Sequence, residues 1–158
     1  MFGCFNADTN EADIMQTTFK SAVDSFNDGK FVKAKDQFSS LIYSNPLSGN
    51  IDDCQFYIAE CEYSLNNYRQ AIVEYSKYLR SNYRKSSFTT KSELMLCRCH
   101  YKLSMEYSKD QSDTYLALDK LQYYIENENL KEFKDEISNM IKDLRNTLAK
   151  KDFETARL

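Results

Sequence analysis

Hydrophobic residues recur along this chain with the spacing of one face of an α-helix. Side chains three and four positions apart lie on the same side of a helix. Two segments share a pattern of aromatic residue, alanine and aromatic residue, and the second follows the first by 37 positions: Phe31, Ala34 and Phe38, then Tyr68, Ala71 and Tyr75. Ala22 and Phe26 correspond to Ala59 and Tyr63 at the same offset. The pattern predicts repeated helical units.

A third copy of the unit follows, with an insertion. Cys97 and Cys99 take the positions that Ala59 and Cys61 hold, at an offset of 38 residues. Further along, the offset to the second unit grows to 46, which places about eight extra residues within 104–115. The insertion therefore separates the two helices of the third unit.

Residues 132–158 are predicted to form the first helix of a fourth unit. Their apolar residues follow helical spacing: Ile137, Ile141, Leu144 and Leu148. The sequence stops before a second helix of this unit. We therefore expect the face that carries Ile141, Leu144 and Leu148 to be incompletely covered.

Turn residues divide each unit into two helices. In the first unit we expect helices at about 12–27 and 31–44, because Gly29 suits a left-handed C-terminal cap and Pro46 cannot continue a helix. Asn66-Asn67 takes the corresponding place in the second unit.

Two further helix starts carry capping residues. Residues 90–93, Thr-Lys-Ser-Glu, have the spacing of a capping box at the start of the third unit. After the insertion, Ser112 or Asp113 is expected to cap the next helix, since short polar side chains accept hydrogen bonds from the first free backbone N–H groups.

A helix pair of this kind cannot bury its apolar face alone, so neighbouring pairs stack. The small, aromatic and proline positions of residues 15–48 resemble a tetratricopeptide repeat. We predict an all-α, tetratricopeptide-like right-handed solenoid of antiparallel helix pairs. A flexible tether at 1–11 is expected to precede a single repeat domain at 12–158, whose units are 12–48, 49–85, 88–130 and 132–158.

Composition supports a helical globular chain and excludes several functions. Three glycines and one proline are too few for a turn-rich β-sandwich, while 42% hydrophobic residues supply a core. A net charge of −3 argues against nucleic-acid binding, which needs a dense basic surface. No apolar run approaches the roughly 20 residues that span a bilayer.

The segment Cys97-Arg98-Cys99-His100 is the one place that suggests a metal site, and its geometry argues against one. Residues two apart point to opposite sides of a helix, so Cys97 and Cys99 cannot bind the same ion. Cys97 and His100 alone give two ligands where zinc takes four. A single His also gives no convincing nucleophile–base pair. We predict no metal, no cofactor and no enzymatic activity.

Two segments carry a more specific family signal. They are residues 109–122, Lys-Asp-Gln-Ser-Asp-Thr-Tyr-Leu-Ala-Leu-Asp-Lys-Leu-Gln, and residues 144–158, Leu-Arg-Asn-Thr-Leu-Ala-Lys-Lys-Asp-Phe-Glu-Thr-Ala-Arg-Leu. Both resemble the BamD-type lipoproteins of outer-membrane protein assembly, and the resemblance covers essentially residues 12–158. Family chains continue through about one and a half more repeats, so this chain resembles a member truncated at its C-terminus.

The resemblance implies a location and a set of partners. It implies a scaffold on the periplasmic face of the outer membrane, lipid-anchored through Cys4, since Gly3-Cys4 fits the end of the family's lipobox although no signal peptide precedes it. The implied partners are the periplasmic domains of the barrel-forming assembly subunit, other assembly lipoproteins and unfolded outer-membrane proteins.

The resemblance also implies a binding groove on the first helices of the units. Carried onto this sequence, the groove positions are Gln16, Phe19, Lys20, Val23, Asn27, Asp53, Tyr57, Glu60, Ser64, Lys91, Met95, Arg98 and Lys102. Aromatic residues would supply contact area, and charged residues would select among partners.

Two other functions stay open. One is a different periplasmic tetratricopeptide adaptor, of the kind that coordinates envelope constriction, which lacks the Asp-Gln insertion at 110–111. The other is a soluble peptide-clamp co-chaperone. An acylated Cys4 would exclude the clamp, and an unprocessed cytoplasmic N-terminus would exclude the lipoprotein.

Overall fold

The computed structural model describes residues 7–44, 46, 49–80, 88–106 and 111–157. Within these residues the chain is helical and forms no strand. The elements in chain order are α1 (Ala7–Asn27), α2 (Phe31–Ser44), α3 (Ile51–Ser64), α4 (Tyr68–Arg80), α5 (Thr89–Glu106), α6 (Gln111–Ile125), the 3-10 helix η1 (Glu128–Phe133) and α7 (Lys134–Ala156). The predicted all-α class is confirmed.

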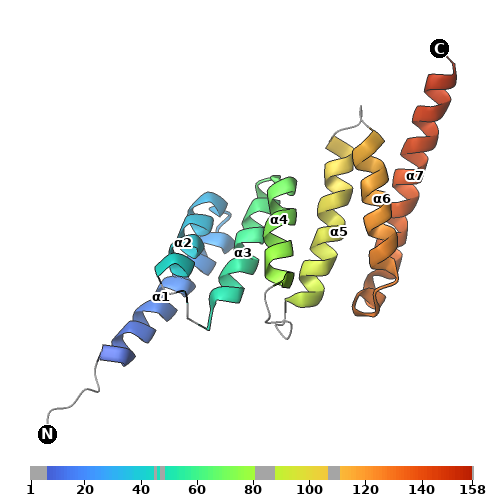
Figure 1. The fold of residues 1–158 in the computed structure, drawn as a ribbon. Coiled ribbons are helices and arrows are strands. Elements are labelled where there is room, and N and C mark those ends of the chain that lie inside the picture. The colour runs from blue at the N-terminus through green and yellow to red at the C-terminus, as the bar shows by residue number, and fades with distance from the viewer. Residues whose placement is uncertain (1–6, 45, 47–48, 81–87, 107–110, 158) are drawn as a thin grey trace, which may run out of the picture.

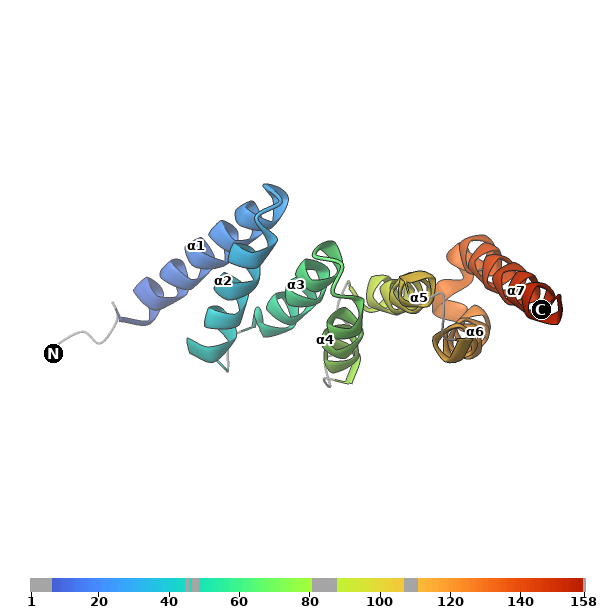
Figure 2. The same ribbon diagram turned by 90° about the horizontal axis from the view of Figure 1, so that it is seen from above.

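The helices form a single extended row in chain order (Figure 1). Each helix packs against the one before it and the one after it, from α1 with α2 through to α6 with α7. In the view of Figure 2, α1, α3, α5 and α7 lie on one side of the row and α2, α4 and α6 on the other. We call the first side the A face. This arrangement of stacked helix pairs is the predicted tetratricopeptide-like solenoid.

The turns inside the first two units share one conformation. Gly29 has a φ of 75° and Asn66 a φ of 62°, both in the left-handed region. After α1, the N–H of Lys30 donates to the carbonyl of Ser25 at 2.9 Å, and the N–H of Asn67 does the same to Glu62 after α3. These bonds satisfy carbonyls that a helix end otherwise leaves free. The predicted turn residues are confirmed.

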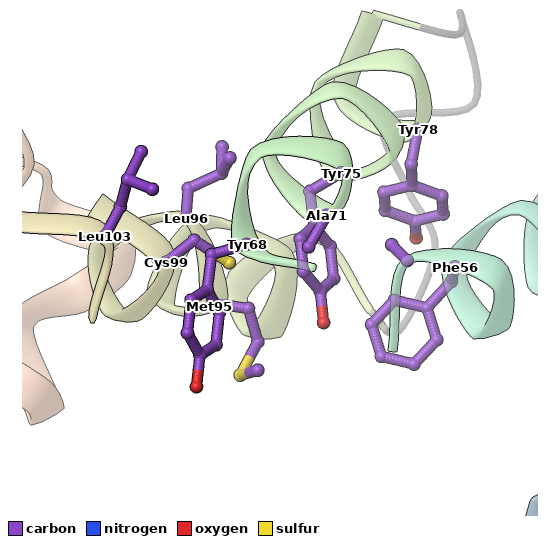
Figure 3. Packing of buried hydrophobic residues seen from close by; sticks show 10 residues of the cluster. Phe56, Tyr68, Ala71, Tyr75, Tyr78, Met95, Leu96, Cys99 and Leu103 are labelled. Carbon is purple, nitrogen blue, oxygen red and sulfur yellow. The ribbon is translucent and has the colours of Figure 1, made fainter. Parts of the chain in front are cut away.

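Three buried clusters hold the row together, and each joins a helix pair to the first helix of the next pair. The first cluster spans α1, α2 and α3, the second α3, α4 and α5 (Figure 3), and the third α5, α6, η1 and α7. The alanines of the repeat pattern are fully buried: Ala22, Ala34, Ala59 and Ala71. Small side chains at these points let the helices come close.

The first helix of a unit is buried on two sides. Cys97 and Cys99 are both fully buried on α5, but Cys97 belongs to the third cluster and Cys99 to the second. On α3, Ala59 faces forward into the second cluster and Cys61 backward into the first. Residues that correspond at the 38-residue offset therefore also pack in the same direction along the row.

Both predicted helix caps after the second unit are wrong. The structure starts α5 at Thr89, so Thr90 lies inside the first turn and does not cap it. It starts α6 at Gln111, so Ser112 and Asp113 also lie inside the helix.

Residues at both helix starts make tertiary contacts. Phe88 stacks on Phe56 of α3 with ring centroids 4.2 Å apart, which positions the chain directly before α5. The carboxylate of Asp113 accepts from Arg69 of α4 at 2.9 Å, so this side chain reaches along the row to another helix on the same side. Side chains engaged in such distant contacts are not visible to a local capping rule.

The expectation of a poorly covered face on α7 is also wrong. Ile141, Leu144 and Leu148 are 7%, 1% and 8% exposed. Ile141 and Leu144 pack in the third cluster with residues of α5, α6 and η1. The earlier helices and Leu130 of the 3-10 helix, which is fully buried, therefore cover this apolar face.

Candidate functional site

The predicted groove residues occupy equivalent positions on α1, α3 and α5. On each helix they follow spacings of four, three and four residues, which keeps them on one side. The three helices lie together on the A face (Figure 2). The candidates are Gln16, Lys20, Val23 and Asn27 of α1, Asp53, Tyr57, Glu60 and Ser64 of α3, and Lys91, Met95, Arg98 and Lys102 of α5, with Phe19 beside the first set.

These candidates differ in how much surface they offer. The exposed ones are Gln16, Lys20, Asn27, Lys91 and Lys102. The partly buried ones are Phe19, Val23, Asp53, Tyr57, Glu60, Ser64 and Arg98. Met95 is 4% exposed and belongs to the cluster drawn in Figure 3, so it offers little surface to a ligand.

The aromatic candidates join the first two units. Tyr57 stacks on Phe38 with ring centroids 5.0 Å apart and meets Phe26 edge-on at 5.4 Å. Phe19 meets Phe38 at 5.8 Å and Tyr57 at 6.1 Å. Edge-to-face and offset contacts at these distances stabilise a fold beyond the area they bury. Phe19 and Tyr57 therefore hold α1, α2 and α3 together while leaving part of each ring at the surface.

Glu60 connects three helices at the centre of the A face. Its carboxylate accepts from the hydroxyl of Tyr75 on α4 and, at 2.9 Å, from Lys91 on α5. The same Lys91 ammonium lies 4.9 Å from the ring centroid of Phe56. Burial, together with the Glu60 charge, raises the pKa of the Tyr75 hydroxyl and keeps it a hydrogen-bond donor. These contacts fix α3 relative to α5.

Arg98 makes the corresponding connection from α5 to α7. Its guanidinium donates to both carboxylate oxygens of Glu136, at 2.7 and 3.1 Å. A two-point contact of this kind sets orientation as well as distance. The hydrogen bond to Glu136 raises the pKa of Arg98. Further along α7, Asp143 accepts from the hydroxyl of Tyr101 at 3.2 Å.

Other charges on the A face have no such partner. Lys20 of α1 and Lys102 of α5 are exposed and form no ion pair among the described residues. Asp53 of α3 is partly buried, and that burial raises the pKa of its carboxyl group. The A face thus combines internally paired charges with exposed cations at its α1 and α5 ends.

The cysteines of the described residues have a packing role. Burial raises the pKa of three of these thiols to about 12: Cys54, Cys61 and Cys97. The thiolate is the reactive form of cysteine, so these groups are unreactive near neutral pH. Burial also lowers the pKa of His100. Within the described part of the chain, no three metal-ligating side chains gather around a common point.

Sequence reasoning missed the partners of the paired charges. Glu60 and Arg98 hold equivalent positions with opposite charge, and this contrast was a visible signal. Their partners lie on other helices. Glu136 follows Arg98 by 38 residues, the same offset that separates Arg98 from Glu60. Lys91 follows Glu60 by 31 residues, which is no repeat offset. Cys4, the predicted lipid anchor, lies outside the described residues.

Residues 11–158 match the YfiO family, described as outer membrane lipoprotein. The chain belongs to this family. The match supports the resemblance at family level. No helix in the described part of the YfiO-family chain is long and apolar enough to cross a membrane.

Solved structures confirm the fold at low sequence identity. The Yersinia enterocolitica type III secretion chaperone SycD, in complex with a peptide of the translocator YopD, is 17% identical with a TM-score of 0.58, over 84% of this chain and 93% of that chain. PcrH from Pseudomonas aeruginosa is 16% identical with a TM-score of 0.52, over 84% and 92%. No curated protein matches this YfiO-family chain by sequence.

Proposed function

We propose that this chain is a non-catalytic scaffold of the machinery that assembles β-barrel proteins in the outer membrane. The observation that carries this proposal is the family match over residues 11–158, together with the BamD-like segments at 109–122 and 144–158. The proposed site of action is the periplasmic face of the outer membrane. Cys4 would carry the lipid. The residues between Cys4 and the repeats would tether the single repeat domain to the membrane.

The A face is the proposed binding surface. Partly exposed rings of Phe19 and Tyr57 offer apolar area, and the exposed cations Lys20 and Lys102 offer charges with no partner among the described residues. Exposed charges select partners and accelerate their approach, while aromatic residues supply contact area. The proposed partners are the periplasmic domains of the barrel-forming subunit, other assembly lipoproteins and unfolded barrel proteins.

The internal ion pairs support this role by holding the A face rigid. Lys91 with Glu60 and Arg98 with Glu136 link consecutive helices of the A face through side chains. A surface that already has its binding geometry loses less conformational entropy when a partner binds. The proposed mechanism is therefore shape and charge complementarity on a preorganised wall.

The test is purification of the intact protein, with its native N-terminus, from envelopes by an affinity tag. We expect a barrel-forming assembly subunit to co-purify. The double variant K20E/K102E on the A face is expected to lower its recovery by about threefold or more, because exposed ion pairs are individually weak. K33E/K131E changes net charge equally at exposed positions on α2 and η1, and should leave recovery unchanged.

A second candidate function is a soluble peptide-clamp chaperone. It is favoured by the similarity in fold to SycD, which was solved with a translocator peptide. Mass spectrometry of the native protein separates the two. An acylated Cys4 supports the lipoprotein scaffold, whereas an unmodified N-terminus with a bound soluble client, and no barrel subunit in the purification, would replace it with the clamp.

A further inference from the structure

A groove lies between the last two α-helices of the structure, apart from the proposed A-face site. It encloses about 590 Å³ and is lined by Ile125 and Glu126 of α6 and by Ser138, Ile141, Lys142 and Arg145 of α7, among others. We call it the α6–α7 groove. Cavities of roughly 300–1,000 Å³ are large enough for a ligand or for several side chains of a partner.

The groove has an apolar centre. Ile125 is partly buried and Ile141 is 7% exposed, and both also contact the third buried cluster. Because each isoleucine is anchored in the core, the centre of the groove is rigid. A rigid apolar surface between polar walls is suited to an aliphatic side chain.

The wall that α7 contributes is positively charged. Lys142 and Arg145 lie three residues apart, are exposed, and form no ion pair within the described part of the chain. Asp143, between them in sequence, accepts from Tyr101 instead. Glu126 supplies the one acidic group on the opposite wall. The groove therefore carries a local positive excess on a chain whose net charge is −3.

The shape and chemistry favour a peptide over other ligands. The groove is partly open to solvent, and its two cations are exposed, whereas a small-molecule site surrounds most of its ligand with convergent polar groups. Two cations are too few for a nucleic-acid backbone. Carboxylates on a partner segment would pair with both cations, and guanidinium groups bind carboxylates with two hydrogen bonds.

We propose that the α6–α7 groove binds an acidic peptide segment of a partner protein, which places an aliphatic side chain against the partly buried Ile125 and carboxylates beside the exposed Lys142 and Arg145. The lining of this site shares no residue with the A-face candidates on α1, α3 and α5. Its occupant is independent of whether the A face binds barrel-assembly partners.

The test measures binding of two fluorescein-labelled peptides by anisotropy. The acidic probe is Asp-Leu-Glu-Asp-Leu-Leu-Asp-Glu, and the basic probe carries Lys in place of each acid. We expect saturable binding of the acidic probe alone. K142E/R145E should weaken that binding about tenfold or more and allow the basic probe to bind, since two attractions become two repulsions.

Three controls separate the groove from general charge effects. K131E/K150E, at exposed positions outside the groove lining, changes net charge equally and should leave affinity within about twofold. S138W fills the groove without altering charge and should abolish binding. The A-face variant K20E/K102E should bind the acidic probe normally, which distinguishes this site from the proposed function.

Several results would overturn the proposal. They are no saturable binding of the acidic probe up to about 1 mM, equal affinity in wild type and K142E/R145E, or binding that survives S138W. Sedimentation velocity supplies one more result that would overturn the proposal. A wild-type dimer that dissociates in K142E/R145E would mean that a second copy of the chain occupies the groove.

Discussion

Replacing Phe38 with Ala is expected to unfold the N-terminal end of the row while the C-terminal end stays folded. Phe38 is fully buried in the cluster that joins α1, α2 and α3. Its ring contacts Tyr57 at 5.0 Å and Phe19 at 5.8 Å. Removing a buried phenylalanine side chain costs about 3–5 kcal/mol. That is a large part of the whole stability of a small domain, about 5–15 kcal/mol.

The loss should remain local because this cluster shares no buried residue with the other two, and only the partly buried Tyr57 packs against both it and the second cluster. In a stacked-repeat protein, stability is approximately a sum of units and nearest-neighbour interfaces. Hydrogen exchange measured by mass spectrometry resolves this directly. Amides of α1 and α2 should lose most of their protection in F38A, whereas amides of α6 and α7 should keep theirs to within about 1 kcal/mol.

The matched control is Tyr43→Ala on the same helix. Tyr43 is 90% exposed, so its removal should change the free energy of unfolding by less than about 0.5 kcal/mol. Equal loss of protection at both ends of F38A would refute the reasoning. It would show that the row unfolds as one cooperative unit and that the three clusters are not energetically separate.

Three further predictions concern a turn, an ion pair and the buried thiols. Gly29→Ala should lower the urea midpoint by an amount equivalent to about 1 kcal/mol, because a Cβ there meets no atom within 4 Å and only the left-handed backbone resists it; an unchanged midpoint would contradict this. A double-mutant cycle with Arg98→Gln and Glu136→Gln should give a coupling free energy of about 0.5–1 kcal/mol. This coupling should decline in 1 M NaCl, since both side chains are about one-third exposed. A coupling that does not change with salt would argue against the ion pair. The free energy of unfolding should fall as pH rises from about 9 towards 12, because the folded chain retains thiol protons that the unfolded chain releases. Replacing these cysteines with alanine should flatten the dependence of stability on pH. An unaltered dependence would exclude the thiols as its cause.

The repeat offset predicted the fold because packing imposes it. Ala59 and Cys97 are interchangeable in the sequence comparison, and both turn out to be fully buried residues facing forward in the row. Gly29 and Asn66 were likewise predictable, since few residues adopt a positive φ without strain. These features depend on local backbone geometry or on close helix contact, which restrict residue type strongly.

The candidate site was predictable only as far as the side of each helix. Periodicity places Met95 on the A face with Lys91, but it does not show that the methionine is buried while the lysine pairs with Glu60. The pairing of Lys91 with Glu60 depends on how far α5 lies along α3. Such offsets between helices follow from packing of the whole row, which a pattern within one helix does not contain.

The two-sided burial of the first helices restricts how this architecture changes length. Each cluster needs a helix pair and the first helix of the next pair. Inserting or deleting two helices together therefore preserves every kind of contact. Loss of a single helix would bring the first helices of two units against each other. Their small residues would then no longer face the helices against which they pack. Related chains are therefore expected to differ in length by whole pairs, and single-helix deletions should misfold.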